Sequence, residues 1–312
     1  MNTLKTYFIL AFLFTVIILL GLLIVGLTGN INYLWGAIII SVTMNFVSYF
    51  YSDKIALSIS GAKPIEEYLN YKQQKEKNIK EDSFINKDFN RDNINIYKNV
   101  VRDLSAKNNM PEPSLYIIED SSPNAFATGR NEDHAAIAVT TGLLSMMSNE
   151  ELAGVLAHEL SHIKNKDILI MSVVVVAVSI LSLFSQTAMH LSAGSNRESK
   201  GSVYSSLINI LSVVVAILMP VASMIIQASI SQKREYMADA SGAILAENSN
   251  GIISALKKLG SINMPLEKAN VATAHMYISN PFGNSDSQSF LQRLFMTHPP
   301  IEERIAALES TK

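Results

Sequence analysis

Two long stretches near the start of the chain are almost wholly apolar. No charged side chain occurs between Lys5 and Asp53, and a polar GNIN turn divides this region into residues 7–28 and 33–51. A helix needs about 20 apolar residues to cross a bilayer. A cleaved signal peptide is the alternative for the first stretch, but its apolar region is usually about 7–15 residues long and ends at a small-residue cleavage site. The pattern therefore predicts a two-helix membrane anchor over residues 1–53.

Two further apolar stretches lie deeper in the chain, at residues 168–189 and roughly 207–230, with a polar turn between them. The first contains four consecutive valines at 173–176, yet its length favours a helix over a strand. Pro220 is expected to kink the second. Each stretch is either a membrane helix or a helix buried in a protein core. We expect membrane helices 3 and 4, inserted over residues 168–230.

Polar sequence flanks this insertion on both sides. Residues 54–90 contain many charged and asparagine side chains and are predicted to be a charged connector. Residues 91–167 and 231–312 are predicted to be the two parts of one soluble domain, with a small sheet from about residue 114 to 142. The sequence thus predicts a mainly helical membrane protein that carries one α+β domain.

The order of the apolar stretches also predicts an orientation. An even number of crossings precedes the connector and another even number lies within the insertion, so both parts of the soluble domain face the same side. Basic residues such as Lys54 and Lys233 flank the helices on that side, whereas the GNIN turn has none. Arg197 and Lys200 in the other external turn run against this pattern. Because cytoplasmic loops carry an excess of Lys and Arg, we expect a multi-pass plasma-membrane protein with its soluble domain in the cytoplasm.

Composition narrows the chemistry. Charged residues are 17% of the chain, below the roughly 25% of average soluble proteins. The net charge of −2 and the lack of a basic cluster predict no nucleic-acid partner. The absence of cysteine excludes disulfides, a catalytic thiol and thiolate metal ligands. Any metal must therefore be held by histidine and carboxylate side chains.

Two of the six histidines stand four residues apart in the sequence HELSH, at His158 and His162. On a helix both rings lie on one face and can bind the same ion. Ser148 followed by Glu151 is a capping-box pattern that predicts a helix start just before them. Glu159, beside the first ligand, could take a proton from a zinc-activated water and pass it to a leaving amine. The alternative is an ordinary helix with two exposed histidines.

A third ligand is expected after the last apolar stretch. Glu235 and Asp239 stand at helical i, i+4 spacing in SQKREYMADASGA. The predicted topology puts Glu235 on the same side as His158, so it can complete a catalytic zinc site of three protein ligands. Asp239 can support a ligating histidine from behind. Taken alone, the segment could equally be a solvated acidic helix face.

These motifs together resemble the HtpX-type membrane zinc metalloproteases, which are related to the CAAX-prenyl proteases. The resemblance covers nearly the whole chain after residue 50. It rests on the segments YSDKIALSISGAKP, SPNAFATGRNEDHAAIAVTTGLL, VLAHELSHIKNKDI, REYMADASGA, ATAHMYISNP and LFMTHPPIEERIAAL, which follow one another in the family's order and spacing.

The resemblance implies a zincin-like cytosolic domain that binds one Zn²⁺ per chain. His158, His162 and Glu235 would be the metal ligands, and Glu159 the general base and acid. The substrates would be proteins or peptides, in particular misfolded or membrane proteins cleaved at the cytosolic face of the lipid bilayer. Protein quality control in the stress response is the implied role. No oligomeric state is predicted.

The resemblance also implies a substrate-binding strand made of Asn124, Ala125, Phe126 and Ala127. An extended peptide can add to an exposed sheet edge through main-chain hydrogen bonds, whatever its side chains. The alternative is a plain turn followed by a strand.

Three further residues in the last part of the chain have alternative interpretations. His298 and Arg304 correspond to family residues that approach the scissile carbonyl, where they could stabilise an oxyanion. The same segment is also typical of a helix start, with Pro299 in the first turn. His275 corresponds to a loop histidine that can cover the metal in some related soluble enzymes.

The sequence thus predicts a zinc metalloendopeptidase with four transmembrane helices. A CAAX-type prenyl-protein protease is the second reading, since it would use the same chemistry. A non-enzymatic scaffold that retains the metal would not need Glu159. A transporter would place ionisable residues inside the spans, and the four apolar stretches contain none.

Overall fold

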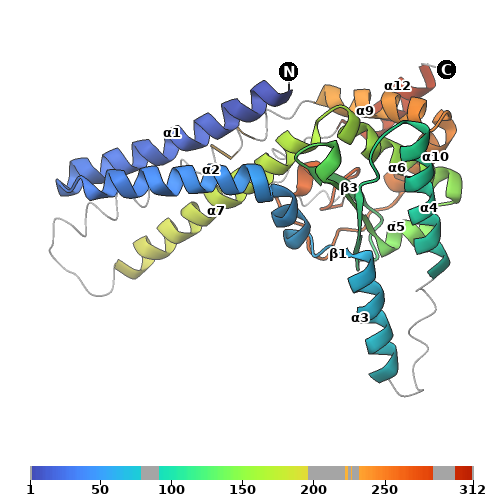
Figure 1. Cartoon of the computed structure of the whole chain (residues 1–312), viewed down its shortest axis with the longest axis horizontal. Coiled ribbons are helices and arrows are strands. Elements are labelled where there is room, and N and C mark those ends of the chain that lie inside the picture. The colour runs from blue at the N-terminus through green and yellow to red at the C-terminus, as the bar shows by residue number, and fades with distance from the viewer. Residues whose placement is uncertain are drawn as a thin grey trace.

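The computed structural model describes residues 2–78, 91–195, 222–223, 226, 232–283 and 299–310. Helices make up most of this part of the chain and surround one small mixed sheet (Figure 1). The prediction of a mainly helical protein with a small sheet is therefore confirmed. Two predictions fall outside the described residues: the second inserted span, except for three positions, and His298.

The chain begins with a hairpin of two long apolar helices, α1 (Asn2–Thr28) and α2 (Asn32–Ile59), which lie side by side in Figure 1. Gly21 lets them approach closely, because a Cβ there would lie 2.5 Å from the Cβ of Ala37. Both helices are long and apolar enough to cross a membrane, and only 22% and 17% of their most apolar windows are buried. Apolar helices that remain so exposed are suited to lipid rather than to a protein core.

A third apolar helix, α7 (Ile168–Ser195), runs beside this hairpin. It is a helix along the valine run, as its length predicted. It follows α6 (Asn149–Lys164) at a bend of 85°, and this bent pair is the third candidate for a span among the described residues. Unlike α1 and α2, α7 has a largely buried first half, from Ile168 to Leu181.

The sheet has four strands in the order β1-β2-β4-β3. Its strands are β1 (Lys63–Pro64), β2 (Ser114–Ile118), β3 (Ala125–Gly129) and β4 (Ala135–Thr140). β4 runs parallel to β2 and antiparallel to β3, with Ile117 and Ala127 opposite Val139 and Ile137 respectively. β1 pairs antiparallel with β2, so the predicted connector contributes a short strand that the sequence did not indicate.

The remaining helices pack on the sheet, on α6 or on one another. They are α3 (Ile65–Asn78), α4 (Arg91–Lys107), α5 (Thr141–Met146), α9 (Gln232–Leu245), α10 (Ser249–Ser261) and α12 (Ile301–Ser310), with short 3₁₀ turns η2 (Glu132–His134) and η3 (Ala274–Met276).

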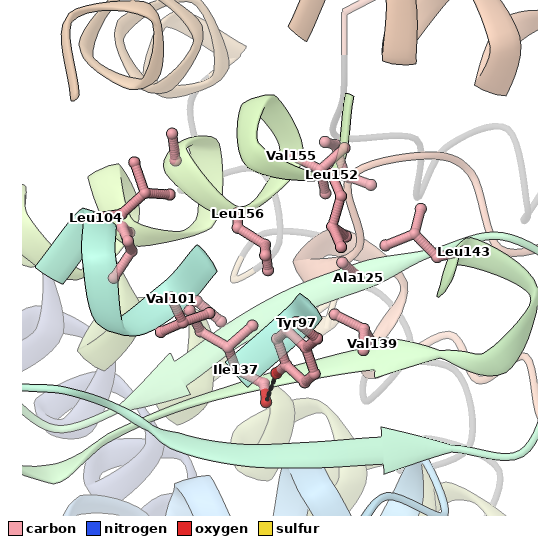
Figure 2. Packing of buried hydrophobic residues seen from close by; sticks show 14 of the residues in the cluster. Tyr97, Val101, Leu104, Ala125, Ile137, Val139, Leu143, Leu152, Val155 and Leu156 are labelled. Carbon is pink, nitrogen blue, oxygen red and sulfur yellow. Dashed lines mark hydrogen bonds between the residues drawn. The ribbon is translucent and has the colours of Figure 1, made fainter. Parts of the chain in front are cut away.

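The core of the polar half lies between α4, α6 and the sheet. Figure 2 shows Tyr97 and Val101 of α4 and Leu156 of α6 meeting strand residues such as Ile137. The Tyr97 hydroxyl donates to the Ile137 carbonyl at 2.9 Å, so its polar end is satisfied within this core. Each fully buried aliphatic side chain contributes about 1.5–3 kcal/mol. The hydrophobic core therefore fixes α6 against the sheet.

Helix α6 begins at the capping box that the sequence predicts. The Ser148 hydroxyl accepts from the Glu151 backbone, and the Glu151 carboxylate accepts from the Ser148 backbone, which completes the capping box. The Glu151 carboxylate also accepts from Lys258 at 2.6 Å and from Ser254 at 2.7 Å. The N-terminus of α6 is thus anchored to α10.

Candidate metal centre

Two histidine rings of α6 face each other in the interior. His158 and His162 stand one helical turn apart and are 1% and 2% exposed. Their Nε2 atoms lie 3.2 Å apart. Side chains at i and i+4 lie one above the other on a helix, and here both lone pairs can be directed at one point between the rings.

The carboxylate of Glu235 reaches the same point from α9. Its Oε1 lies 3.6 Å from Nε2 of His162, and its Oε2 lies 3.8 Å from Nε2 of His158. Glu235 is itself buried. Three residues from two helices thus place one donor atom each within 4.8 Å of one another.

The close approach of α9 to α6 depends on two small residues. A Cβ at Gly242 would lie 2.9 Å from the backbone nitrogen of His158. The hydroxyl of Ser161 donates to the carbonyl of Ala238 at 2.9 Å, so it bonds the two helices together at the same level. These contacts bring Glu235 into reach of the histidines.

The donor set fits a zinc ion. Zinc bonds of about 2.0–2.2 Å in a tetrahedral arrangement place donor atoms about 3.4 Å apart. The observed separations of 3.2, 3.6 and 3.8 Å lie around this value. Two imidazoles and one carboxylate are a donor set found in hydrolytic zinc enzymes.

Asp239 and Arg304 stand behind the ring of His158. Nδ1 of His158 lies 2.9 Å from Oδ1 of Asp239, although the pair is not aligned as a regular hydrogen bond. Arg304 donates to both oxygens of Asp239, at 2.8 and 2.7 Å. Burial opposes ionisation of Asp239, but the guanidinium outweighs it and lowers the pKa of this carboxyl. An ionised carboxylate at Nδ1 favours the tautomer whose Nε2 can bind a metal.

Asp167 occupies the equivalent position behind His162, and our sequence analysis did not single it out. Its Oδ2 lies 3.2 Å from Nδ1 of His162, and its Oδ1 lies 3.7 Å from Nε of Arg234. Asp167 is 2% exposed and Arg234 is 7% exposed. The only sequence signal was the pair of charged residues next to the motifs, at the end of HELSHIKNKD and at the start of REYMADA.

The buried carboxylate of Glu159 is near enough to His162 and Glu235 for their charges to shift its pKa. Within the described part of the chain neither of its oxygens has an aligned hydrogen-bond partner. Burial raises the pKa of Glu159 to about 8, and the nearby charge of His162 and the Ala127 backbone of β3 counteract only part of this. Glu159 is therefore a buried carboxyl group with a strongly raised pKa, which makes it a candidate functional residue.

The two histidines differ in their affinity for protons when no metal is bound. Burial lowers the pKa of His158, and the Asp239 carboxylate offsets only part of this effect. Burial acts in the same direction on His162, but the carboxylates of Asp167 and Glu235 outweigh it and raise the pKa to about 9. The metal-free His162 is therefore protonated at neutral pH, and a metal bound by this ring would have to displace that proton.

The segment predicted to bind substrate forms β3 and the residue before it, at one edge of the sheet. Ala125 points its carbonyl outward, where it accepts from the Ile278 backbone at 3.0 Å. Phe126 packs edge-on against Tyr277, with ring centroids 5.1 Å apart. The Asn124 side chain donates to the Ser279 carbonyl at 3.0 Å. The 277–279 segment thus covers the start of this edge.

The other predicted residues are placed as follows. Arg304 lies on α12 and is fully buried, with a further donor to the Ile278 carbonyl at 2.9 Å. His275 lies in η3, and its Nε2 is 3.0 Å from the Met171 carbonyl rather than among the three metal donors. The roles assigned to these residues remain predictions.

Comparison with known proteins identifies the family to which this site belongs. Residues 94–312 match the family described as Peptidase family M48. The chain belongs to peptidase family M48. It is 39% identical over 320 residues to "Protease HtpX homolog" of Thermoanaerobacter pseudethanolicus, which covers 99% of this chain and 95% of the relative. A relative of the same description from Campylobacter hominis is 39% identical over 317 residues, and the match covers 100% of this chain and 99% of the relative.

A crystal structure of S. mikatae Ste24p resembles this M48 peptidase more distantly. It is 19% identical, covers 98% of this chain and 65% of that protein, and superposes with a TM-score of 0.42.

Membership in family M48 confirms the family resemblance and the enzyme class predicted from the motifs. The chain is a metallopeptidase. Its two apolar N-terminal helices lie within the region shared with the relatives and make it a membrane protein.

Proposed function

We propose that this M48 peptidase is a zinc endopeptidase that cleaves misfolded or membrane proteins at the cytoplasmic face of the plasma membrane. The observation that carries the proposal is the convergence of His158, His162 and Glu235 in a buried site, with the Glu159 carboxylate buried and within electrostatic reach of them. An endopeptidase at the cytoplasmic face of the membrane would have access to misfolded and membrane proteins, which is the access that protein quality control requires.

Glu159 is the proposed general base and acid. Zinc held by the three ligands would supply Lewis acidity, which polarises a peptide carbonyl and acidifies a water molecule. Glu159 would accept a proton from the attacking water and deliver it to the nitrogen of the leaving amine. A nearby cation lowers the pKa of a carboxyl group. Bound zinc would therefore lower the pKa of Glu159 from about 8 toward 7.

Arg304 is proposed as a positioning residue. Its guanidinium donates to Asp239 and to the Ile278 carbonyl. Its Nη1 also lies 3.8 Å from Oε2 of Glu235. These contacts favour a role in holding Asp239, which we propose supports His158, over direct contact with a substrate oxyanion. The oxyanion role proposed for His298 rests on the family resemblance alone.

Substrate is proposed to pair with β3. A peptide added along this edge would pass Ala127, whose backbone is close enough to lower the pKa of Glu159, and would replace the contact from Ile278 to Ala125. A cavity of about 320 Å³ adjoins the start of β3 and could take a substrate side chain; Ser122, Pro123, Ile278, Asn280 and Arg304 are among its lining residues. Main-chain pairing of this kind recognises extended segments of many sequences.

The site is proposed to lie at the membrane surface. α7 begins at Ile168, four residues after α6 ends at Lys164, so the histidine-bearing helix leads directly into an apolar one. Figure 1 shows α1, α2 and α7 projecting together from the body that contains the sheet. We propose four membrane crossings, with residues 91–167 and 231–312 forming one zincin-like domain in the cytoplasm.

The test is cleavage of unfolded casein by the detergent-purified full chain with added zinc, beside Glu159→Gln. We expect the wild type to cleave and the variant to keep its zinc but lose activity by at least about 100-fold, within the range that general acid–base catalysis contributes. Equal cleavage by both proteins would contradict the proposed role of Glu159. Zinc binding without cleavage by the wild type would instead favour a narrower substrate, such as a prenylated peptide, or a scaffold.

A further inference from the structure

A turn after α6 brings Asp167 back onto the helix that it follows. The backbone N–H of Lys166 donates to the carbonyl of Ile163 at 3.0 Å, and that of Asp167 donates to the carbonyl of His162 at 2.9 Å. Lys166 has a φ of 58°. These are the two bonds and the left-handed residue of a Schellman motif. The motif reverses the chain, so the Asp167 carboxylate meets the ring of His162.

Asp167 also starts the next helix. Its carbonyl accepts from the Met171 backbone at 3.1 Å, in the first turn of α7. One residue thus ends the turn after the histidine-bearing helix, begins the apolar helix and contacts His162. Its place in the chain is the entrance to the insertion 168–230.

Arg234 stands at the exit from the same insertion. It lies in the first turn of α9, directly before Glu235, and its Nε is 3.7 Å from Oδ1 of Asp167. Both terminal nitrogens are buried without a hydrogen-bond partner in the described part of the chain. Burial lowers the pKa of Arg234. The Asp167 carboxylate thus lies within ion-pair distance of this guanidinium, and its charge counteracts part of the effect of burial.

The two histidines therefore have matching support. His158 is backed by Asp239 with Arg304 behind it, and His162 is backed by Asp167 with Arg234 behind it. Carboxylates in this position fix the tautomer and orientation of a ligating ring, and their loss typically costs about 10–100-fold in metal affinity.

We propose that Asp167 and Arg234 are positioning residues for the metal centre. Asp167 holds His162 with Nε2 directed at the metal, and Arg234 holds Asp167 while closing the two ends of the inserted segment. The inference rests on the proposed ligand role of His162. It adds that metal affinity depends on a carboxylate at the junction between the soluble domain and the apolar helices.

The test is zinc affinity of the full chain in detergent, measured by competition with a chelating dye, for Asp167→Asn and for Asp167→Asn combined with Arg234→Leu. We expect Asp167→Asn to weaken zinc binding by about 10–100-fold. This variant leaves the buried Arg234 without the Asp167 charge, which by itself is expected to lower stability. The double variant removes both charges, and such replacements are often neutral for stability.

The double variant separates positioning from a purely structural role. We expect the metal-free double variant to melt at the same temperature as the metal-free wild type. Its zinc affinity should stay low, because the Asp167 carboxylate that contacts His162 is still missing. Asp133→Asn, at an exposed position in η2, serves as the control and should match the wild type. Recovery of zinc affinity together with stability would overturn the inference, and so would unchanged affinity in Asp167→Asn.

His162→Ala distinguishes this inference from the proposed function. If His162→Ala binds zinc as tightly as the wild type, then the ligand assignment itself is wrong. If His162→Ala loses zinc while Asp167→Asn binds normally, only the positioning role fails.

Discussion

In the proposed metal site, a proton on His162 competes with the metal for the ring. In the metal-free protein the surrounding carboxylates raise the pKa of His162 to about 9. A metal competes with that proton for the ring, so the apparent affinity falls wherever His162 is protonated. At the residue scale the carboxylates that raise the pKa of His162 are therefore expected to make the proposed metal affinity depend on pH.

Zinc affinity should rise by about tenfold per pH unit between pH 6 and 8 and level off near pH 9, because one proton is displaced below the pKa and none above it. Chelator competition across this range, corrected for protonation of the chelator, measures the slope. A flat profile in the wild type would mean that His162 binds no proton in the metal-free site.

Local spacing made some site residues predictable and left others hidden. His158 and His162 meet because of their i, i+4 spacing, which is visible in the sequence. The contact between Asp167 and His162 depends on a left-handed Lys166, and no sequence rule favours lysine at that position. Arg304 reaches Asp239 across 65 residues of chain, so only the folded structure shows that pairing.

At the scale of elements, the site depends on how closely α9 lies against α6. Gly242 is the point of closest approach, where a Cβ would come within 3.0 Å of both the nitrogen and the Cα of His158. Backbone atoms cannot move aside as the end of a side chain can. Any side chain at this position must therefore push α9, and Glu235 with it, away from the histidines.

Gly242→Ala should lower the free energy of unfolding by about 1–3 kcal/mol, as overpacking typically does, and should also weaken zinc binding. Chemical denaturation and chelator competition measure the two effects. Gly36→Ala is the matched control, because a Cβ at Gly36 in α2 meets nothing within 4 Å. A Gly242→Ala protein with unchanged zinc affinity would show that the spacing of α6 and α9 does not position Glu235.

A helix or strand could be predicted where its own residues show a recognisable local pattern. The apolar helices, the capping box of α6 and the helix through the valine run follow from local sequence. The two-residue strand β1 does not, because Lys63 and Pro64 become a strand only by pairing with β2. The cover of β3 by the 277–279 segment likewise depends on a contact over 150 residues of chain.

At the scale of the whole molecule, the proposed membrane bundle joins the body that contains the sheet through two short turns among the described residues, between α2 and β1 and between α6 and α7. The exposed apolar faces of α1 and α2 suit lipid, while the first half of α7 is buried beside them. The hairpin turn at residues 29–31 lies at the far end of this bundle from the sheet (Figure 1). The proposed orientation therefore puts that turn outside the cell and the sheet inside.

The absence of native cysteine makes this orientation directly testable. In intact cells a membrane-impermeant maleimide should label Asn30→Cys, in the hairpin turn, and should label Asp133→Cys only after permeabilisation. Both positions are exposed, so accessibility within the protein does not limit the reaction. Labelling of Asp133→Cys in intact cells would reverse the proposed topology.

The most direct test of the account is the zinc content of the purified chain and of its single-site variants, measured by mass spectrometry of the metal after dialysis. We predict one zinc per chain in the wild type and in Glu159→Gln, and a loss of zinc in His158→Ala, His162→Ala and Glu235→Ala. Stoichiometric zinc that persists when any of these three residues is replaced would contradict the central claim that they hold the metal.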